Sequence, residues 1–398
     1  MNLTGSRIFY VIDFSAGNLI THHLNYALAY CKFLKSKGHE YELFTPKYLS
    51  STELDCQFKI NKILYSRNYR LLTDKFTIWT MYYKAQKFFG IFGRIIELVF
   101  GRLLIHFYIH LSYKKIIKSI HNKTIEVIFP STDLMAILLL KKMLSKNANI
   151  SRFYLRLNAV DKNLIDPSIN IDGLKILEEL IKKHPSIIIG CETHNLINYL
   201  ATRNRIFQNA IWLPLPSNSR PAKQTSSSIY GFLGGAKKRK GFEEIPRWVS
   251  KISEIDKNSH FIIQQSPFSW PGYSETIAKL KNLDNVELLP PIISNKEFFL
   301  QIERCSFIMA PYDPDSYKLV GSSLFYYAAD LLIPTITYTG LGFSYDLSEY
   351  GCGIVVKNLD DSLNLAEVNK RKFQIGLESY NNFRNIQNES FLSLHSTE

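Results

Sequence analysis

Short apolar runs alternate along the first half of the chain with segments whose apolar residues recur at helical spacing. Strand-like runs occur at residues 7–13, 41–44, 125–131, 152–157 and 186–192. The clearest helical segment, 21–37, ends at Gly38, a residue type common just after helix ends. Alternating strands and helices predict a parallel, doubly wound α/β sheet. In such sheets, ligands bind beyond the carboxyl ends of the strands.

A second set of alternating segments follows a stretch rich in proline and serine. That stretch, 213–228 (LPLPSNSRPAKQTSSS), has no periodicity and is the best candidate for an interdomain linker. Strand-like runs then occur at 228–235, 260–265, 286–289, 306–311, 335–338 and 353–356, and the chain becomes helical and polar after Asp360. Because 398 residues exceed what one hydrophobic core usually serves, we predict two Rossmann-like domains, 1–216 and 217–398, with a cleft between them.

The net charge of +13 lies entirely in the first of these halves. Residues 1–216 hold 29 basic against 15 acidic side chains, whereas residues 217–398 hold 19 against 20. Such asymmetry predicts an acidic partner for the first half, namely a membrane surface, a phosphorylated acceptor or nucleic acid.

Residues 59–123 concentrate this charge together with aromatic side chains. The segment has thirteen basic residues and only two acids, Asp74 and Glu97. Arg94, Glu97 and Arg102 interrupt its apolar runs, so no stretch is long enough to cross a bilayer. We predict basic, aromatic-rich helices lying at an anionic lipid interface. The alternative is a helical insertion that packs its aromatic side chains into the first domain.

The cysteines and the N-terminus indicate the compartment. Five cysteines are scattered without a C-x-x-C pair, which argues against a disulfide framework or a zinc site and favours a reducing environment. The N-terminal residues lack the features of a signal peptide. We therefore expect a cytoplasmic protein, peripheral on the inner face of the cell membrane.

Residues 231–246 (GFLGGAKKRKGFEEIP) predict a strand, a glycine turn, a basic cluster and a helix start. Glycines allow the backbone to approach a phosphate closely, and basic side chains neutralise its charge. The candidate diphosphate-binding residues are Gly234, Gly235, Lys237, Arg239 and Lys240. The alternative is a basic turn that is merely solvated.

Residues 310–340 predict a second turn of this kind. A strand leads into a Pro/Asp turn containing Tyr317, and Gly321, Ser322 and Ser323 then open a helix. A helix N-terminus offers free N–H groups and the positive end of the helix dipole, which suit a diphosphate. An ordinary N-cap is the alternative.

Together these motifs resemble the donor site of GT-B glycosyltransferases of the family-4 type. Gly234 and Lys240–Gly241 match the glycine and the Lys-Gly pair of the first motif, and the PYDP-x-x-Y segment, the Gly-Ser helix start and the proline of the following strand match the second. The resemblance implies a GT-B fold whose second domain binds a nucleotide sugar and whose first domain binds the acceptor. The charge and aromatic pattern of 59–123 indicates that this acceptor is a cell-surface glycan or lipid-linked. Gly235 replaces the usual arginine, and Leu319 and Tyr327 replace two usual glutamates. Retention and inversion therefore both stay open.

Candidate catalytic groups lie in the first half, at strand ends and in the loop 14–23. Asp133, Asp161 and Glu192 each follow a predicted strand, and if the reaction inverts, Asp133 or Asp161 would deprotonate the acceptor hydroxyl. His22 is a further candidate, with His23 beside it. Structural roles as helix caps are the alternative for the acids.

No metal or other cofactor is expected. Asp313-Pro-Asp315 formally matches the D-x-D motif of metal-dependent glycosyltransferases, but its central proline suits a turn. Two other functions stay open, a nucleotide-sugar epimerase of the same architecture and a non-catalytic nucleic-acid-binding protein. The aromatic residues cluster with apolar ones and no nucleic-acid-binding signature occurs, so we expect no nucleic-acid partner.

Overall fold

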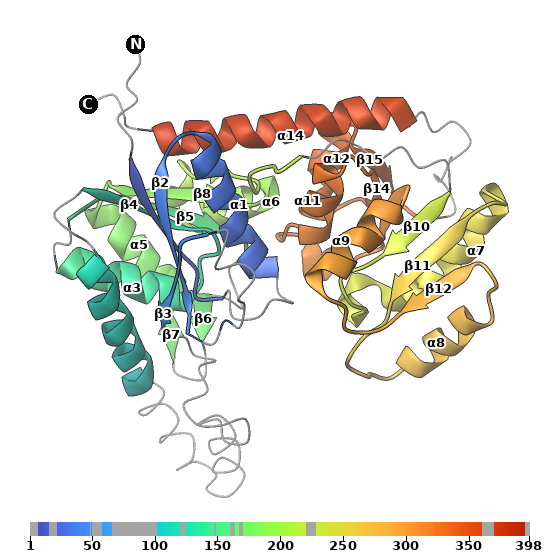
Figure 1. Cartoon of the computed structure of the whole chain (residues 1–398), viewed down its shortest axis with the longest axis horizontal. Coiled ribbons are helices and arrows are strands. Elements are labelled where there is room, and N and C mark those ends of the chain that lie inside the picture. The colour runs from blue at the N-terminus through green and yellow to red at the C-terminus, as the bar shows by residue number, and fades with distance from the viewer. Residues whose placement is uncertain are drawn as a thin grey trace, which may run out of the picture. The chain divides into compact units, whose positions relative to one another are not determined.

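The computed structural model in Figure 1 describes residues 7–15, 22–47, 49, 58–65, 102–119, 124–146, 149–159, 164–166, 170–219, 228–359 and 370–394. The chain divides into two compact units. Unit 1 comprises Met1–Cys191 and Leu200–Ile211, and unit 2 comprises Glu192–Tyr199 and Trp212–Glu398.

A seven-stranded sheet forms the centre of unit 1, in the order β3-β2-β1-β4-β5-β8-β9. Its strands are β1 (Ile8–Ile12), β2 (Glu40–Pro46), β3 (Ile60–Leu64), β4 (Ile125–Phe129), β5 (Ile150–Leu157), β8 (Ile187–Cys191) and β9 (Ile211–Trp212). Neighbouring strands from β3 to β8 pair in parallel. A short antiparallel pair, β6 (Ile165–Asp166) and β7 (Ile171–Asp172), lies outside this sheet.

The helices of unit 1 include α1 (His22–Ser36), α3 (Leu134–Ser145), α5 (Gly173–Lys183) and a helix at 102–119. The chain continues through α6 (His194–Arg203) and the short turn η1 (Arg205–Phe207). Strand β4 is buried along its whole length, as is β8, and α3 buries eight of its twelve residues. Strands and helices this apolar are typical of a parallel sheet covered on both faces, so the predicted doubly wound sheet is confirmed.

Unit 2 contains a six-stranded parallel sheet in the order β12-β11-β10-β13-β14-β15. These strands are β10 (Ile229–Phe232), β11 (His260–Gln264), β12 (Val286–Leu289), β13 (Phe307–Ala310), β14 (Thr335–Tyr338) and β15 (Gly353–Val356). Its helices include α7 (Ile245–Ile255), α8 (Tyr273–Lys281), α9 (Asn295–Arg304), α10 (Pro314–Tyr317), α11 (Ser323–Asp330), α12 (Ser344–Tyr350) and α14 (Lys370–Ser393), with the turns η2 (Lys238–Lys240) and η3 (Phe242–Glu244) before α7. One buried cluster includes Trp248 and another includes Leu324.

Each sheet has a point where its strand order reverses. In unit 1, β1 pairs with β2 on one side and β4 on the other, and in unit 2, β10 lies between β11 and β13. At such a switch point the two connecting chains leave in opposite directions, and a crevice forms outside the carboxyl ends of the strands. The segments after β1 and β4, and after β10 and β13, are therefore the places where a ligand site is expected.

The basic segment 59–123 differs in part from the prediction of helices throughout. It begins with β3, because Ile60–Leu64 pairs with β2 as an edge strand. A helix at 102–119 agrees with the prediction, and residues 66–101 lie outside the described part of the chain. Among the described residues, no helix is long and apolar enough to span a bilayer.

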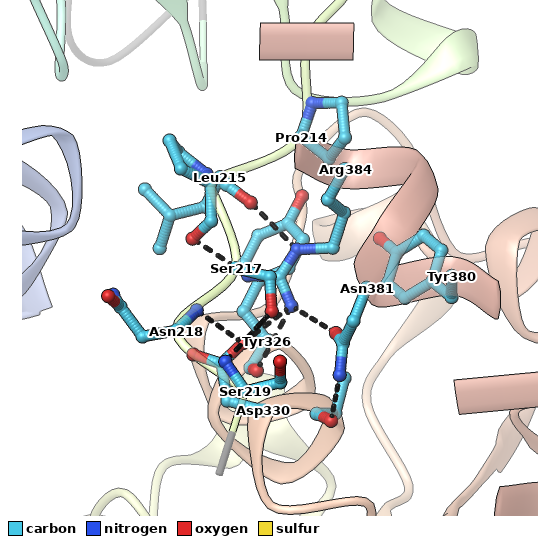
Figure 2. Close-up of polar contacts among 12 residues, drawn as sticks. Pro214, Leu215, Ser217, Asn218, Ser219, Tyr326, Asp330, Tyr380, Asn381 and Arg384 are labelled. Carbon is cyan, nitrogen blue, oxygen red and sulfur yellow. Dashed lines mark hydrogen bonds and ion pairs between the residues drawn. The ribbon is translucent and has the colours of Figure 1, made fainter. Parts of the chain in front are cut away.

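The first part of the predicted linker lies against α14, where Arg384 holds it (Figure 2). The buried guanidinium of Arg384 donates from Nε to Leu215 O (2.7 Å) and from Nη2 to Pro216 O (3.2 Å). Its Nη1 forms an ion pair with Asp330 at 2.9 Å. Asn388 adds a hydrogen bond to Pro214 O at 3.0 Å. Residues 214–216 are therefore fixed to the C-terminal helix, although they form neither helix nor strand.

Candidate functional site

One glutamine side chain accepts hydrogen bonds from the glycine turn that follows β10. Gly234 and Gly235 have positive φ angles of 87° and 74°, which glycine adopts without strain. Both of their N–H groups donate to Gln264 Oε1, at 2.9 and 3.0 Å. Gln264 Nε2 donates in turn to Pro291 O at 3.2 Å. The buried Gln264 side chain thus joins the segments that follow β10 and β12.

Three basic side chains surround this turn. Lys240 Nζ donates to Gly234 O at 2.7 Å. Burial of the ammonium group, with the nearby charges of Lys237 and Arg239, lowers the pKa of Lys240 to about 7. Partial burial and Arg239 also lower the pKa of Lys237. In the described part of the chain, no carboxylate forms an ion pair with any of these three side chains. The turn therefore carries positive charge without a neutralising acid.

Gly241 brings the turns after β10 and β13 into contact. It has a φ of 69°, and a Cβ at this position would lie 1.8 Å from Pro311 O. Asp313 N also donates to Arg239 O at 3.1 Å. The two motifs that the sequence predicts to bind a diphosphate are thus adjacent, at the switch point of the unit 2 sheet.

Two tyrosines connect the basic turn to the start of α11. The rings of Tyr312 and Tyr317 lie 4.5 Å apart. Arg239 lies 5.8 Å from the Tyr317 ring, and Lys240 lies 5.8 Å from the Tyr312 ring. The Tyr312 hydroxyl also interacts with the side chain of Ser322. Tyr317, a predicted donor-site residue, therefore belongs to the same cluster as the basic side chains.

At the start of α11, the Gly-Ser-Ser motif packs closely against the segment that follows β8. Ser322 caps the helix by accepting from Phe325 N at 3.3 Å, and Ser323 is the first helical residue. A Cβ on Gly321 would lie 2.5 Å from the carboxyl carbon of Glu192. The Glu192 carboxyl group thus lies against the helix start, in the region where the sequence predicts a diphosphate.

Hydrogen bonds fasten the Glu192 segment in this position. Thr193 Oγ1 donates to Leu319 O at 2.9 Å, and Asn195 Nδ2 donates to Lys318 O at 2.8 Å. Only tertiary structure reveals this contact, because 126 positions separate Thr193 from Leu319 in the sequence. In the sequence, Glu192 is one of three acids that follow predicted strands, and sequence position alone does not distinguish it from Asp133 and Asp161.

At the positions where the resemblance expects glutamates, the structure has apolar packing and backbone contacts. Tyr327 is buried, with its ring 5.2 Å from that of Phe299 and 6.2 Å from that of Phe298. Leu319 contributes its carbonyl group to the contact with Thr193. Neither position supplies a carboxylate.

The Asp313-Pro-Asp315 segment forms a capped turn. Asp313 accepts hydrogen bonds from Asp315 N (3.3 Å), Ser316 N (3.2 Å) and the Ser316 hydroxyl, and these lower its pKa. Across the described ranges, no three His, Cys, Asp or Glu side chains form a group that could hold a metal ion. Metal independence stays a prediction.

In unit 1, Asp133 follows β4 and caps α3. Its Oδ1 accepts from Ala136 N at 2.9 Å, and its Oδ2 accepts from the Ser15 hydroxyl at 3.0 Å. Burial raises its pKa despite these bonds. Both oxygens of Asp133 thus have structural partners, and its role as a base stays a prediction.

The other two predicted catalytic residues give less information. Asp161 lies outside the described residues, and His22 is the first residue of α1, with a side chain outside them as well. The neighbouring His23 is described, and its Nδ1 lies 2.9 Å from Ser131 Oγ. Burial, with the nearby charge of Arg156, lowers the pKa of His23 to about 4. Its imidazole is therefore neutral at physiological pH.

Solved structures share this fold over nearly the whole chain. A complex of Anabaena Alr3699/HepE with UDP and glucose superposes with a TM-score of 0.61 at 9% identity, covering 99% of this chain and 100% of that one. Sucrose-phosphate synthase from Thermosynechococcus elongatus gives 0.60 at 10% identity, covering 98% and 100%. The catalytic domain of starch synthase IV from Arabidopsis thaliana, bound to ADP and acarbose, gives 0.60 at 11% identity, covering 98% and 99%.

No protein-family model and no curated protein sequence matches the chain. The structural likeness defines the class at the level of the fold, which is the two-Rossmann-domain GT-B architecture. The predicted fold class is confirmed.

Proposed function

We propose that this protein is a glycosyltransferase that moves a sugar from a nucleotide-sugar donor to a cell-surface glycan or lipid-linked acceptor. The observation that carries the proposal is the group of three basic side chains, Lys237, Arg239 and Lys240, at the switch point of the unit 2 sheet. The described residues provide them with no acid partner. Such a group suits a ligand that brings two or more negative charges, as a nucleotide diphosphate does.

The same cations would assist the chemistry. In sugar transfer, the bond from the anomeric carbon to the diphosphate oxygen breaks, and a bond to the acceptor oxygen forms. Negative charge develops on the departing diphosphate, and fixed cations at that place stabilise the transition state. The acceptor hydroxyl loses its proton to a base, and Asp133 and Asp161 remain the candidates for that role. The proposal includes no metal, so activity should survive a chelator.

The structural relatives support a nucleotide ligand. The Anabaena protein was solved with UDP and glucose, and the Arabidopsis domain with ADP and acarbose. Both share the two-domain architecture of this chain. In this chain, the basic side chains Lys237, Arg239 and Lys240 follow β10, at the carboxyl ends of the strands of unit 2.

Calorimetry with UDP-, GDP-, dTDP-, ADP- and CMP-sugars tests the donor site. At least one should bind, and Lys240→Met should weaken it by about 1–3 kcal/mol, the usual range for losing a charge-assisted hydrogen bond. Lys257→Met is the matched control, because Lys257 precedes β11 and so lies at the opposite edge of the same sheet. Equal affinities for wild type and Lys240→Met would remove this site assignment.

We also propose that unit 1 binds an anionic membrane surface through the helix at 102–119. Leu103 and Phe107 are 62% and 54% exposed, and Lys114 and Lys118 are exposed further along the helix. These four positions recur at intervals of four, seven and four residues, so they lie along one face of the helix. An exposed stripe that is apolar at one end and basic at the other suits the boundary between lipid headgroups and acyl chains.

A further inference from the structure

A cluster of buried polar side chains lies at the switch point of the unit 1 sheet. Ser131 and Thr132 follow β4, and Asn158 follows the neighbouring strand β5. All three side chains are at least nine-tenths buried. Because β4 and β5 pair in parallel, the segments that follow them leave the same edge of the sheet. A hydrogen bond from Thr132 N to Arg156 O, at 3.1 Å, joins the two segments. This is the edge where parallel sheets bind their ligands.

Ser131 is the centre of the cluster. Asn158 Nδ2 donates to Ser131 Oγ at 2.9 Å, and His23 Nδ1 lies 2.9 Å from the same oxygen. Since the His23 imidazole is neutral at physiological pH, the Asn158–Ser131–His23 group adds no charge. This group is thus a set of neutral donors and acceptors.

Two polar atoms of this cluster have no hydrogen-bond partner among the described residues. They are Asn158 Oδ1 and Thr132 Oγ1, and both are shielded from solvent. A buried amide oxygen or hydroxyl without a hydrogen bond costs free energy. The two unsatisfied atoms, Asn158 Oδ1 and Thr132 Oγ1, therefore call for an explanation. A bound group that both donates and accepts hydrogen bonds would satisfy them.

We propose that Thr132, Asn158 and the Ser131–His23 pair form a binding site for hydroxyl groups of a neutral sugar. This inference rests on the proposed function, since the sugar would be part of the glycan that receives the transferred residue. Asn158 Oδ1 accepts from a sugar hydroxyl, and the Thr132 hydroxyl either donates to it or accepts from it. A hydroxyl-bearing neutral ligand fits better than an anion, because Asn158 Oδ1 can only accept hydrogen bonds.

Near-isosteric substitutions test the site directly. Thr132→Val replaces the unpaired hydroxyl by a methyl group, and Asn158→Leu replaces the amide by an apolar group of similar size. Saturation-transfer NMR is measured with the methyl glycosides of glucose, galactose, N-acetylglucosamine and rhamnose. Ser112→Ala is the matched control, because Ser112 is a buried serine of unit 1 whose hydroxyl accepts from Tyr65 N, away from this sheet edge.

We expect at least one glycoside to bind the wild type, with a signal that falls fivefold or more in Thr132→Val and in Asn158→Leu and is retained in Ser112→Ala. The thermal midpoint of Thr132→Val should equal or exceed that of the wild type, since an unpaired buried hydroxyl is removed. If no glycoside binds the wild type, or if binding survives both substitutions, the proposal is wrong and the two atoms meet only ordered water. Nucleotide-sugar affinity is measured on the same proteins, so failure of the unit 2 donor site would appear separately.

Discussion

Lys240 Nζ lies 2.7 Å from the carbonyl oxygen of Gly234, and burial lowers the pKa of this lysine to about 7. The lysine is therefore charged below neutral pH in the free protein and largely neutral above it. A diphosphate bound beside it favours the charged form. We predict that affinity for a nucleotide sugar falls roughly tenfold from about pH 6 to about pH 8. At the higher pH, Lys240 must take up a proton from solvent when the diphosphate binds.

A nucleotide sugar is the right ligand for this titration, since its diphosphate carries no proton that titrates near neutrality. Calorimetry in buffers of different ionisation enthalpy should show proton uptake on binding at pH 8. The Lys240→Met variant should lose both the pH dependence and the proton uptake. An affinity that stays constant across this pH range in the wild type would show that Lys240 does not meet the diphosphate.

The contact between Gly321 and Glu192 predicts a steric effect on stability. A Cβ at position 321 would lie 2.5–2.7 Å from three atoms of the Glu192 side chain. We expect Gly321→Ala to destabilise the protein by about 1–3 kcal/mol, as overpacking of a filled site usually does. Urea unfolding measures it. Glu192→Ala removes the obstructing carboxyl group, so the double variant should be more stable than the sum of the two single effects predicts. Strict additivity would contradict this packing.

Replacing Arg384 should cost more stability than Gly321→Ala does. Its guanidinium is buried and holds Asp330 and two carbonyl groups of residues 215–216. Arg384→Met leaves these groups without their donor, and we expect a loss of about 3–5 kcal/mol. Arg247→Met is the control, because the Arg247–Glu244 pair is exposed and about 1 kcal/mol or less is expected. Similar unfolding midpoints for both variants would show that the Arg384 contacts contribute little.

The alternation of strands and helices could be predicted because each sheet contains buried apolar strands, such as 125–129 in unit 1 and 307–310 in unit 2. Strand β3 was missed for a physical reason. Its sequence, INKIL, places two polar residues in a short edge strand within a basic segment, so neither helical nor strand periodicity is evident. Two-residue strands such as β9 carry no periodic pattern at all.

The adjacency of the two glycine motifs in unit 2 follows from strand order, but the individual contacts do not. The sequence places Gln264 within the predicted strand 260–265, and only the fold shows that its amide lies beside Gly234 and Gly235. In unit 1, the sequence favoured His22, whereas the described contact with Ser131 comes from His23. Neighbouring residues on a helix point about 100° apart, so the choice depends on the rotation of α1, which composition and spacing do not determine.

The exposed face of the helix at 102–119 predicts reversible binding to anionic vesicles. Lys114 and Lys118 are exposed, whereas Lys115 lies 5.2 Å from the Tyr65 ring. Each lysine near an anionic surface contributes about 1 kcal/mol. Lys114→Glu/Lys118→Glu should therefore weaken binding to phosphatidylserine vesicles at least tenfold, as measured by flotation, and high salt should do the same.

The matched control changes the same charge elsewhere in unit 1. Lys182→Glu/Lys183→Glu alters two exposed residues at the end of α5, and binding should change little. Both double variants should bind the nucleotide sugar as the wild type does. Equal binding to neutral and anionic vesicles would show that charge is not the cause, and no binding to either would favour an insertion that only packs within unit 1.

The fate of the nucleotide sugar tests the central claim most directly. The protein is incubated with the nucleotide sugar that binds it, with EDTA present and with a bacterial lipid-linked glycan extract as acceptor, and the products are identified by mass spectrometry. We predict free nucleoside diphosphate and an extract glycan heavier by one sugar residue, with both products much reduced in Lys240→Met and retained in Lys257→Met. An unchanged glycan together with a nucleotide sugar of altered configuration would contradict the account and identify an epimerase instead.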